Sequence, residues 1–216
     1  MSSRDTILGR VRTALADVPA DETPQDVPVP RNYRRAHTVP GEDLVALFAE
    51  RVADYRATVH RTDETGLTGA IAAALAARAV RHVAVPSGFP ETLLPSGPWT
   101  WHGEPLDVPD LDALDGTLTL AAAGIAVTGT LVLDTGPGQG RRALTLIPDY
   151  HLCVVYAEQI AADVPDALAL LDPTRPLTFI SGPSATSDIE LDRVEGVHGP
   201  RTLDVIVVAP NHPEQP

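Results

Sequence analysis

Apolar residues at helical spacing predict three helices in the first eighty positions. The first spans residues 3–17, with Ser3 as its N-cap, and its apolar positions are Ile7, Leu8, Val11 and Leu15. The second spans residues 42–57, where one face carries Leu44, Leu47, Phe48 and Val52 and Tyr55 extends it. The third, residues 67–79, is rich in alanine. These helices precede the first stretch that has the pattern of a strand.

The second half of the chain is dominated by short, β-branched apolar runs. Strands are predicted at residues 82–85, 118–120, 124–127, 130–133, 142–147, 152–155, 177–180 and 203–208. Residues 157–171 are predicted to form a helix, and residues 95–109 irregular surface. Within that surface, Trp99 and Trp101 can either stack on a ligand or cover the edge of a core. Helices followed by strands favour a parallel sheet and the α/β class.

A proline-rich stretch separates the first predicted helix from the rest of the chain. Five of them break residues 18–40, at positions 19, 24, 28, 30 and 40, and the residues between are mostly polar. This composition predicts a linker or an extended arm. We therefore expect an N-terminal helix and Pro-rich arm over residues 1–40, an α/β domain over residues 41–209, and a polar tail over residues 210–216.

Composition and charge exclude several classes of protein. With 44% hydrophobic residues, the 216-residue chain can bury a core, so general disorder is not expected. The net charge is −13, which argues against non-specific binding of nucleic acid. All sixteen basic residues are arginine, and an absence of lysine across the whole chain indicates a codon bias. No signal peptide and no apolar span are visible, so the sequence predicts a cytoplasmic location.

Cysteine and histidine patterns give no metal or redox motif. Cys153 is the only cysteine, so the chain can form no internal disulfide and cannot hold an iron–sulfur cluster by itself. His151 and Cys153 should share one face of a strand, but two ligands do not make a zinc site. Because Cys153 lies within an apolar strand, a core position is the better interpretation than a nucleophile.

A glycine-rich run at residues 134–140 invites a nucleotide-binding interpretation. Phosphate-binding turns lead into the N-terminus of a helix, whereas residues 143–147 alternate like a strand. A long hairpin loop explains the glycines better. Arg141 and Arg142 can still hold an anion beside this loop.

The segment after the predicted strand 177–180 is rich in hydroxyl groups. Ser187 and Glu190 have the spacing of a capping box, which predicts a short helix beginning at Asp188. A strand, a glycine turn and a helix N-terminus together make a cradle for a phosphate or carboxylate. The expected ligand contacts here are Ser181, Gly182, Ser184, Thr186 and Ser187. Alternatively, these hydroxyl groups satisfy only their own backbone.

A second polar segment follows at residues 196–201. Arg201 can bind a carboxylate through two hydrogen bonds, with Arg141 or Arg142 adding positive charge. His198 is a candidate acid or base, and Asp188 and Glu190 are its candidate partners. The alternative role for His198 is a turn histidine bonded to the backbone.

These residues resemble a known family. The segments 181–190 and 194–201 resemble the C-terminal signature of the LUD-domain family, in particular its LutC branch, and residues 124–133 resemble a second motif of that family. The resemblance covers about residues 40–209. It implies a three-layer α/β/α sandwich like that of the ribose-phosphate isomerase and CoA-transferase group, with ligands at the carboxyl ends of the strands. It also places Gly129 and Thr130 among the ligand-binding residues.

The resemblance implies a role beside lactate oxidation. LutC-like proteins belong with iron–sulfur subunits associated with oxidising L-lactate to pyruvate, so such subunits are the expected partners and clusters are expected only in them. One departure is Val127, where family members often carry glutamate; valine cannot act as an acid or base. Two alternatives stay open: an independent enzyme acting on a small carboxylate, phosphosugar or CoA thioester, and a sensor that binds such a ligand without reaction.

Overall fold

The computed structural model divides the chain into two compact units, Met1–Arg34 and Arg35–Pro216. It describes residues 2–19, 21–23, 25–26, 29–30, 32, 37, 41–183, 185–186, 194–196 and 198–210. Among these described residues, no helix is both long enough and apolar enough to cross a bilayer.

The first unit contains helix α1 (Ser3–Ala14), which confirms the helix expected at the N-terminus. Its N-cap is Ser2 and not Ser3, because the Ser2 hydroxyl accepts from the Asp5 N–H while the Asp5 carboxylate accepts from the Ser2 N–H. This reciprocal pair is a capping box. None of the side chains of α1 is buried within this unit.

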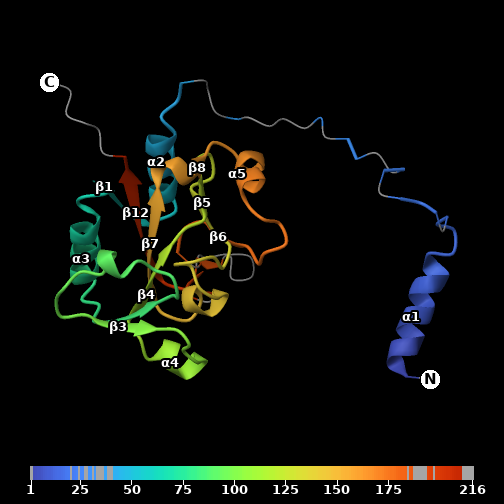
Figure 1. Ribbon diagram of the computed structural model, residues 1–216, viewed down its shortest axis with the longest axis horizontal. Coiled ribbons are helices and arrows are strands. Elements are labelled where there is room, and N and C mark those ends of the chain that lie inside the picture. The colour runs from blue at the N-terminus through green and yellow to red at the C-terminus, as the bar shows by residue number, and fades with distance from the viewer. Residues whose placement is uncertain are drawn as a thin grey trace. The chain divides into compact units, whose positions relative to one another are not determined.

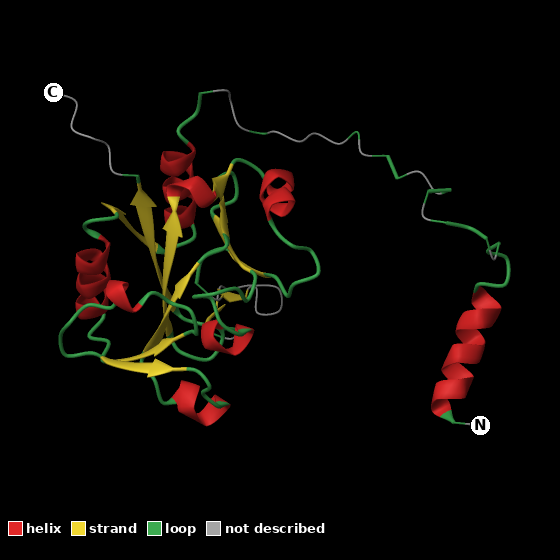
Figure 2. Cartoon of the chain, in the orientation of Figure 1, coloured by secondary structure: helices red, strands yellow, loops and turns green. Residues whose placement is uncertain are grey.

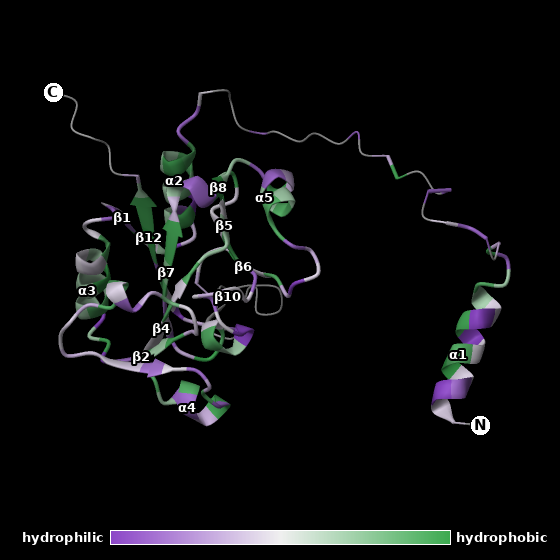
Figure 3. Cartoon of the chain, viewed as in Figure 1, coloured by the Kyte–Doolittle hydropathy of each residue, from purple (hydrophilic) through white to green (hydrophobic). Residues whose placement is uncertain are grey.

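The second unit is built on a six-stranded, wholly parallel sheet (Figure 1). In spatial order its strands are β1 (Thr58–Asp63), β12 (Thr202–Ala209), β7 (Tyr150–Tyr156), β4 (Gly116–Leu120), β2 (His82–Val85) and β3 (Thr100–Gly103). The expected parallel α/β sheet is therefore confirmed. Its central strands β12 and β7 are among the most hydrophobic parts of the chain (Figure 3).

Alternating side chains of the central strands face two different layers. Val154 pairs with Ile206, and both pack against α3 (Leu67–Ala77) on one face of the sheet. Cys153 pairs with Val205, and both pack on the other face, against α2 (Leu44–Asp54). Burial on both faces explains why these strands are continuous apolar runs.

A smaller sheet shares the α2 side of the main sheet (Figure 2). In spatial order it contains β8 (Ile160–Ala161), β5 (Ala123–Ile125), β6 (Thr130–Leu133) and β9 (Thr178–Ile180). Ala167 of α5 (Val164–Leu170) packs against the outer side of this sheet. A separate antiparallel ribbon joins β10 (Ala185–Thr186) to β11 (Val194–Glu195).

Two predicted elements are wrong. Residues 142–147 form no strand; the structure has the 3-10 helix η2 (Arg142–Thr145), because Leu144 turns inward to pack with Ala84 and with Leu111 of α4 (Val108–Asp112). Residues 157–171 are not one helix but the 3-10 helix η3 (Ala157–Gln159), then β8, then α5. Gln159 causes the break, since its side chain bonds the Tyr156 N–H and the Ala121 carbonyl.

The irregular surface predicted over residues 95–109 also has to be corrected. It contains the edge strand β3 and the start of α4, and the 3-10 helix η1 (Glu91–Leu93) lies just before it. Trp99 and Trp101 pack against the cluster that includes α3, with ring centroids 6.4 Å apart. This favours their role as the edge of a core.

Candidate functional site

The structure describes only part of the C-terminal hydroxyl-rich segment. Ser184, Ser187, Asp188 and Glu190 lie outside the described residues, as does the helix predicted to begin at Asp188. Thr186 is described only by its place in β10, where it pairs with Val194. These residues therefore stay predictions.

Three of the predicted site residues, Ser181, Gly182 and His198, meet at one cavity of about 250 Å³. The cavity lies at the carboxyl end of β9 and the amino ends of β7 and β12, beside η2. The described residues that line it are Arg142, Thr145, Leu146, His151, Thr178, Phe179, Ile180, Ser181, Gly182, Pro183, His198, Gly199, Pro200 and Leu203. The folded chain thus brings residues 142–151 together with residues 178–203.

A chain of hydroxyl groups connects the cavity to the second sheet. The Ser181 Oγ lies 2.8 Å from the Thr130 Oγ1, which lies 2.7 Å from the Thr128 Oγ1. Thr130 belongs to β6 and is buried, so its hydroxyl holds Ser181 at the end of the neighbouring strand β9. Thr130 acts on the cavity through Ser181 and does not line it.

Gly129 and Gly182 both lie against the end of α2. Gly129 has a φ of +58°, and a Cβ there would lie 2.5 Å from the Arg51 carbonyl carbon. Gly182 has a φ of +81°, and a Cβ there would lie 2.6 Å from the Tyr55 Cβ. Only glycine fits such a backbone at such an approach. Their role in the structure is to bring the two loops close to α2, which fixes the position of Ser181.

The wall that β7 contributes is polar but uncharged. His151 is 1% exposed, its Nε2 lies 2.8 Å from the Thr119 Oγ1, and burial lowers its pKa to about 4. The same Thr119 hydroxyl contacts the Cys153 sulfur at 3.6 Å, so both side chains share one face of the strand as expected. Burial raises the pKa of the Cys153 thiol to about 12, which keeps it protonated and favours the core interpretation.

The described lining of the cavity carries positive charge on a strongly acidic chain. None of the described residues that line it is aspartate or glutamate, although the chain carries 29 of them. Arg142 lines it and forms no ion pair among the described residues. A locally positive pocket of this kind attracts anions.

The other two arginines considered for the site are engaged elsewhere. The Arg201 Nη1 lies 3.2 Å from the Asp149 Oδ2, and both side chains are exposed. The Arg141 guanidinium donates to the Leu106 carbonyl and lies 3.8 Å from the Glu104 Oε1. Neither lines the cavity, so Arg142 is the arginine that the fold places beside Ser181 and His198.

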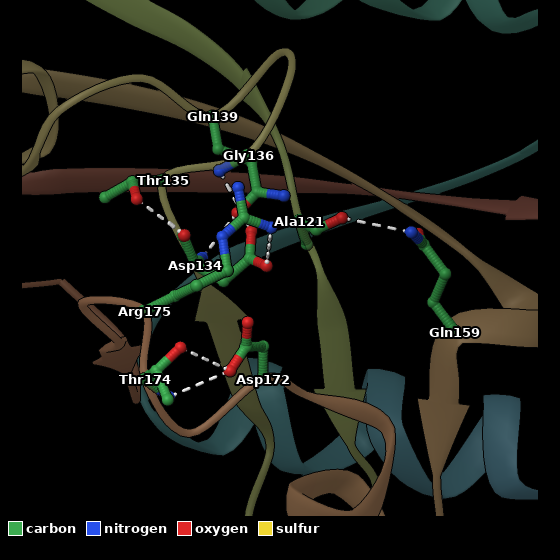
Figure 4. Close-up of polar contacts among 9 residues, drawn as sticks. All are labelled: Ala121, Asp134, Thr135, Gly136, Gln139, Gln159, Asp172, Thr174 and Arg175. Carbon is green, nitrogen blue, oxygen red and sulfur yellow. Dashed lines mark hydrogen bonds and ion pairs between the residues drawn. The ribbon is translucent and has the colours of Figure 1, made fainter.

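The Asp134 carboxylate holds the glycine-rich loop through contacts inside the loop and with Arg175 (Figure 4). The Asp134 carboxylate accepts from Arg175 at 2.6 Å and from the Gly136 N–H at 2.9 Å. Gly138, with a φ of +75°, packs closely against Leu120 at the end of β4. The loop leads into η2, so the hairpin interpretation is wrong, but these contacts still account for the glycines without a phosphate.

A second, more open hollow lies at the carboxyl ends of β2 and β3. Its lining includes Ser87, Glu104, Asp107, Asp110 and Arg141. Three carboxylates oppose one arginine that is already bonded, so this hollow is a poor site for an anion. No group of three or more His, Cys, Asp or Glu residues suited to a metal occurs within the described part of the chain.

Val127, where the family resemblance implies a glutamate, cannot act as an acid or base. Its side chain is half-buried and packs against the apolar cluster of Ile125, Val132 and Ala167. The pocket lining also excludes it. An acid or base for any reaction here must therefore come from another residue.

Comparison with known proteins agrees with the residues that carry the resemblance. The LUD domain model matches residues 110–208. Lactate utilization protein C of Deinococcus radiodurans is 46% identical over 186 residues, which cover 84% of each chain. Lactate utilization protein C of Bacillus subtilis is 23% identical over 97% of each chain.

A solved structure has the same fold. The crystal structure of a DUF162 family protein from Deinococcus radiodurans superposes with a TM-score of 0.66 at 41% identity, covering 76% of this chain and 96% of that one. The long match at 46% identity and the match to the family model agree on the same assignment. The chain belongs to the LUD domain family and is of the LutC type.

Proposed function

We propose that this protein acts in lactate utilisation, as a cytoplasmic, non-redox accessory subunit of an iron–sulfur system that oxidises L-lactate to pyruvate. The observation that carries the proposal is the 46% identity to a lactate utilization protein C over 84% of both chains. The ribose-phosphate isomerase and CoA-transferase group is the wider fold group that we propose for the domain.

The cysteine content supports an accessory role. Oxidation of lactate releases two electrons, and an iron–sulfur cluster needs several thiolates. This chain has one cysteine, which lies on β7 and is buried in the core on the α2 face of the sheet. Electrons released from lactate must therefore pass through groups held by another subunit.

The first test is genetic. A strain that lacks the gene is expected to grow poorly on L-lactate and normally on glucose, and the full-length chain should restore growth. A Cys153→Ala variant should restore it too, since the thiol holds no cluster. Normal growth of the deletion strain on lactate would contradict the proposed role.

The second test is biochemical. Tagged full-length protein, purified from lactate-grown cells, is expected to bring iron and acid-labile sulfide with it, in stoichiometric amounts. Protein purified after expression without the partner genes serves as the control and should carry neither. Equal iron in both preparations would place the cluster on this chain and overturn the non-redox assignment.

The cavity supports one alternative function, an independent enzyme or a sensor for a small anionic ligand. Ser181 and His198 converge there with Arg142, and Asp188 and Glu190 remain predicted partners. Turnover of a small carboxylate, phosphosugar or CoA thioester by the isolated chain would favour the enzyme. Saturable binding without turnover would favour the sensor.

A further inference from the structure

We infer that the cavity beside η2 binds a small 2-hydroxy or 2-oxo monocarboxylate, and that Arg142 is the residue that pairs with its carboxylate. The choice of acid rests on the proposed function in lactate utilisation. The anionic character of the ligand rests on the cavity alone.

Charge is the first part of the argument. Arg142 is the one arginine among the described lining residues, and no described lining residue carries a carboxylate. His151 adds a polar wall without charge, since its buried ring stays neutral at physiological pH. A single guanidinium can donate two parallel hydrogen bonds to one carboxylate. The cavity thus favours a monoanion over a phosphate dianion.

Size is the second part. The volume of about 250 Å³ is below the range of about 300–1,000 Å³ that drug-sized ligands occupy. An acid of three or four carbons fits within this space, whereas a complete CoA thioester would extend beyond it. The volume therefore favours the smallest of the ligand classes left open by the sequence.

The arrangement of polar and apolar walls is the third part. Ser181 and His198 offer hydrogen-bonding groups beside Arg142, and they suit the 2-hydroxyl or 2-oxo group of the ligand. Leu203 and Ile180 supply apolar surface for a methyl group. Ser181 is held in place by its 2.8 Å contact with Thr130, so this part of the site is formed before a ligand arrives.

The test is calorimetric titration of the full-length chain with L-lactate and with pyruvate. Lactamide is the matched probe, because it keeps the size and the 2-hydroxyl group but lacks the charge. Inorganic phosphate tests the preference for a monoanion. Saturable binding of a monocarboxylate, with lactamide and phosphate at least about tenfold weaker, is the expected result.

Three arginine variants locate the site. Arg142→Gln should weaken monocarboxylate binding about tenfold or more, because a charge-assisted hydrogen-bonded pair is lost, and Arg142→Lys should restore part of it. Arg201→Gln is the control, because it removes an equal charge from an exposed ion pair outside the cavity. Circular dichroism and thermal unfolding confirm that each variant is folded.

Three outcomes overturn the inference: no saturable binding of either acid, equal binding of lactamide, or unchanged affinity in Arg142→Gln. Loss of binding in Arg201→Gln with none in Arg142→Gln would also contradict it. These results are separate from the growth test. A deletion strain that grows normally on lactate, together with binding that depends on Arg142, would refute the proposed function and leave the anion site standing.

Discussion

Gly129 shows how one residue fixes the approach of a loop to a helix. We expect Gly129→Ala to lower the free energy of unfolding by about 2–5 kcal/mol. The left-handed backbone contributes about 1–2 kcal/mol to this loss, and the overpacking against α2 about 1–3 kcal/mol. The Cβ would lie 2.5 Å from the Arg51 carbonyl carbon, and neither backbone can yield easily. Urea denaturation measures the change.

Gly69→Ala is the matched control for this substitution. Gly69 is an exposed position in the first turn of α3, and a Cβ there meets nothing within 4 Å. Alanine should stabilise the helix by up to about 1 kcal/mol. Equal effects of the two substitutions would show that the contact between Gly129 and α2 does not matter.

His151 should make stability depend on pH. Its folded pKa of about 4 lies below the usual value of 6.5, because the buried ring resists protonation. Below pH 6.5 the unfolded chain binds a proton that the folded chain does not bind until pH 4 is approached. The contribution of neutral His151 to the free energy of unfolding is therefore complete above pH 6.5. It is lost as the pH falls, by up to about 1.4 kcal/mol per pH unit. A His151→Gln variant should show a flatter decline between pH 6.5 and 4.5 in denaturant titrations; parallel profiles would exclude His151 as the cause.

At the scale of elements, α5 is tied to the arm that precedes the domain. Asp163 is the N-cap residue of α5 but makes no capping bond to that helix. Its buried carboxylate accepts from the His37 N–H at 2.6 Å and contacts the His37 Nδ1 at 2.7 Å. Asp163 stands at the capping position of α5, but its side chain instead binds His37, which lies 126 positions away in sequence.

Breaking this anchor should release His37 without unfolding the sheet. In Asp163→Ala, the His37 amide is expected to exchange its hydrogen at least about tenfold faster, because a charge-assisted hydrogen bond is lost. Asp166→Ala removes an exposed carboxylate from the first turn of the same helix and should leave His37 protected. Amide exchange followed by NMR distinguishes the two, and equal protection of His37 in both variants would contradict the anchoring role.

Whether a strand of the main sheet could be predicted from the sequence depended on its position in the sheet. The pattern located β12, β7, β4 and β2, because strands buried on both faces are continuous apolar runs. It missed β1 and β3, the two edges of the sheet. The sequence of β1, Thr-Val-His-Arg-Thr-Asp, is mostly polar because one of its sides has no neighbouring strand. Edge strands of this kind are recognised only once their neighbour is known.

The apolar pattern also misled where packing was irregular. Residues 143–147 are apolar except for Thr145, which is typical of a buried strand, yet η2 curls so that Leu144 can reach Leu111 and Ala84. The same curl brings Arg142 to the cavity. A local pattern could not reveal this, because the contacts that bend the chain come from distant elements.

At the scale of the whole molecule, the candidate site could be predicted in part. Motif chemistry identified Ser181, Gly182 and His198, which the fold brings together. It could not choose among the three arginines, since that choice depends on which guanidinium already has a partner. It also missed His151 as a cavity wall, although the position of that residue at the start of a buried strand was a usable signal.

The N-terminal unit should serve partners more than stability. Helix α1 buries none of its side chains, and the apolar clusters are built from residues 44–208. A variant that lacks residues 1–34 is therefore expected to keep the midpoint and slope of urea unfolding, because the slope follows the surface that unfolding exposes.

The same truncation should reduce recovery of the proposed iron–sulfur partners from lactate-grown cells. Ile7, Val11 and Leu15 form an exposed apolar stripe on α1, which suits insertion into a groove of another protein. An Ile7→Ser, Val11→Ser variant of the full chain tests the stripe itself, and Thr6→Ser, Thr13→Ser on the opposite face is its control. Lower recovery with the first pair alone, at unchanged stability, assigns partner binding to this helix. Full recovery from the truncated chain would instead place the partner surface on the α/β domain.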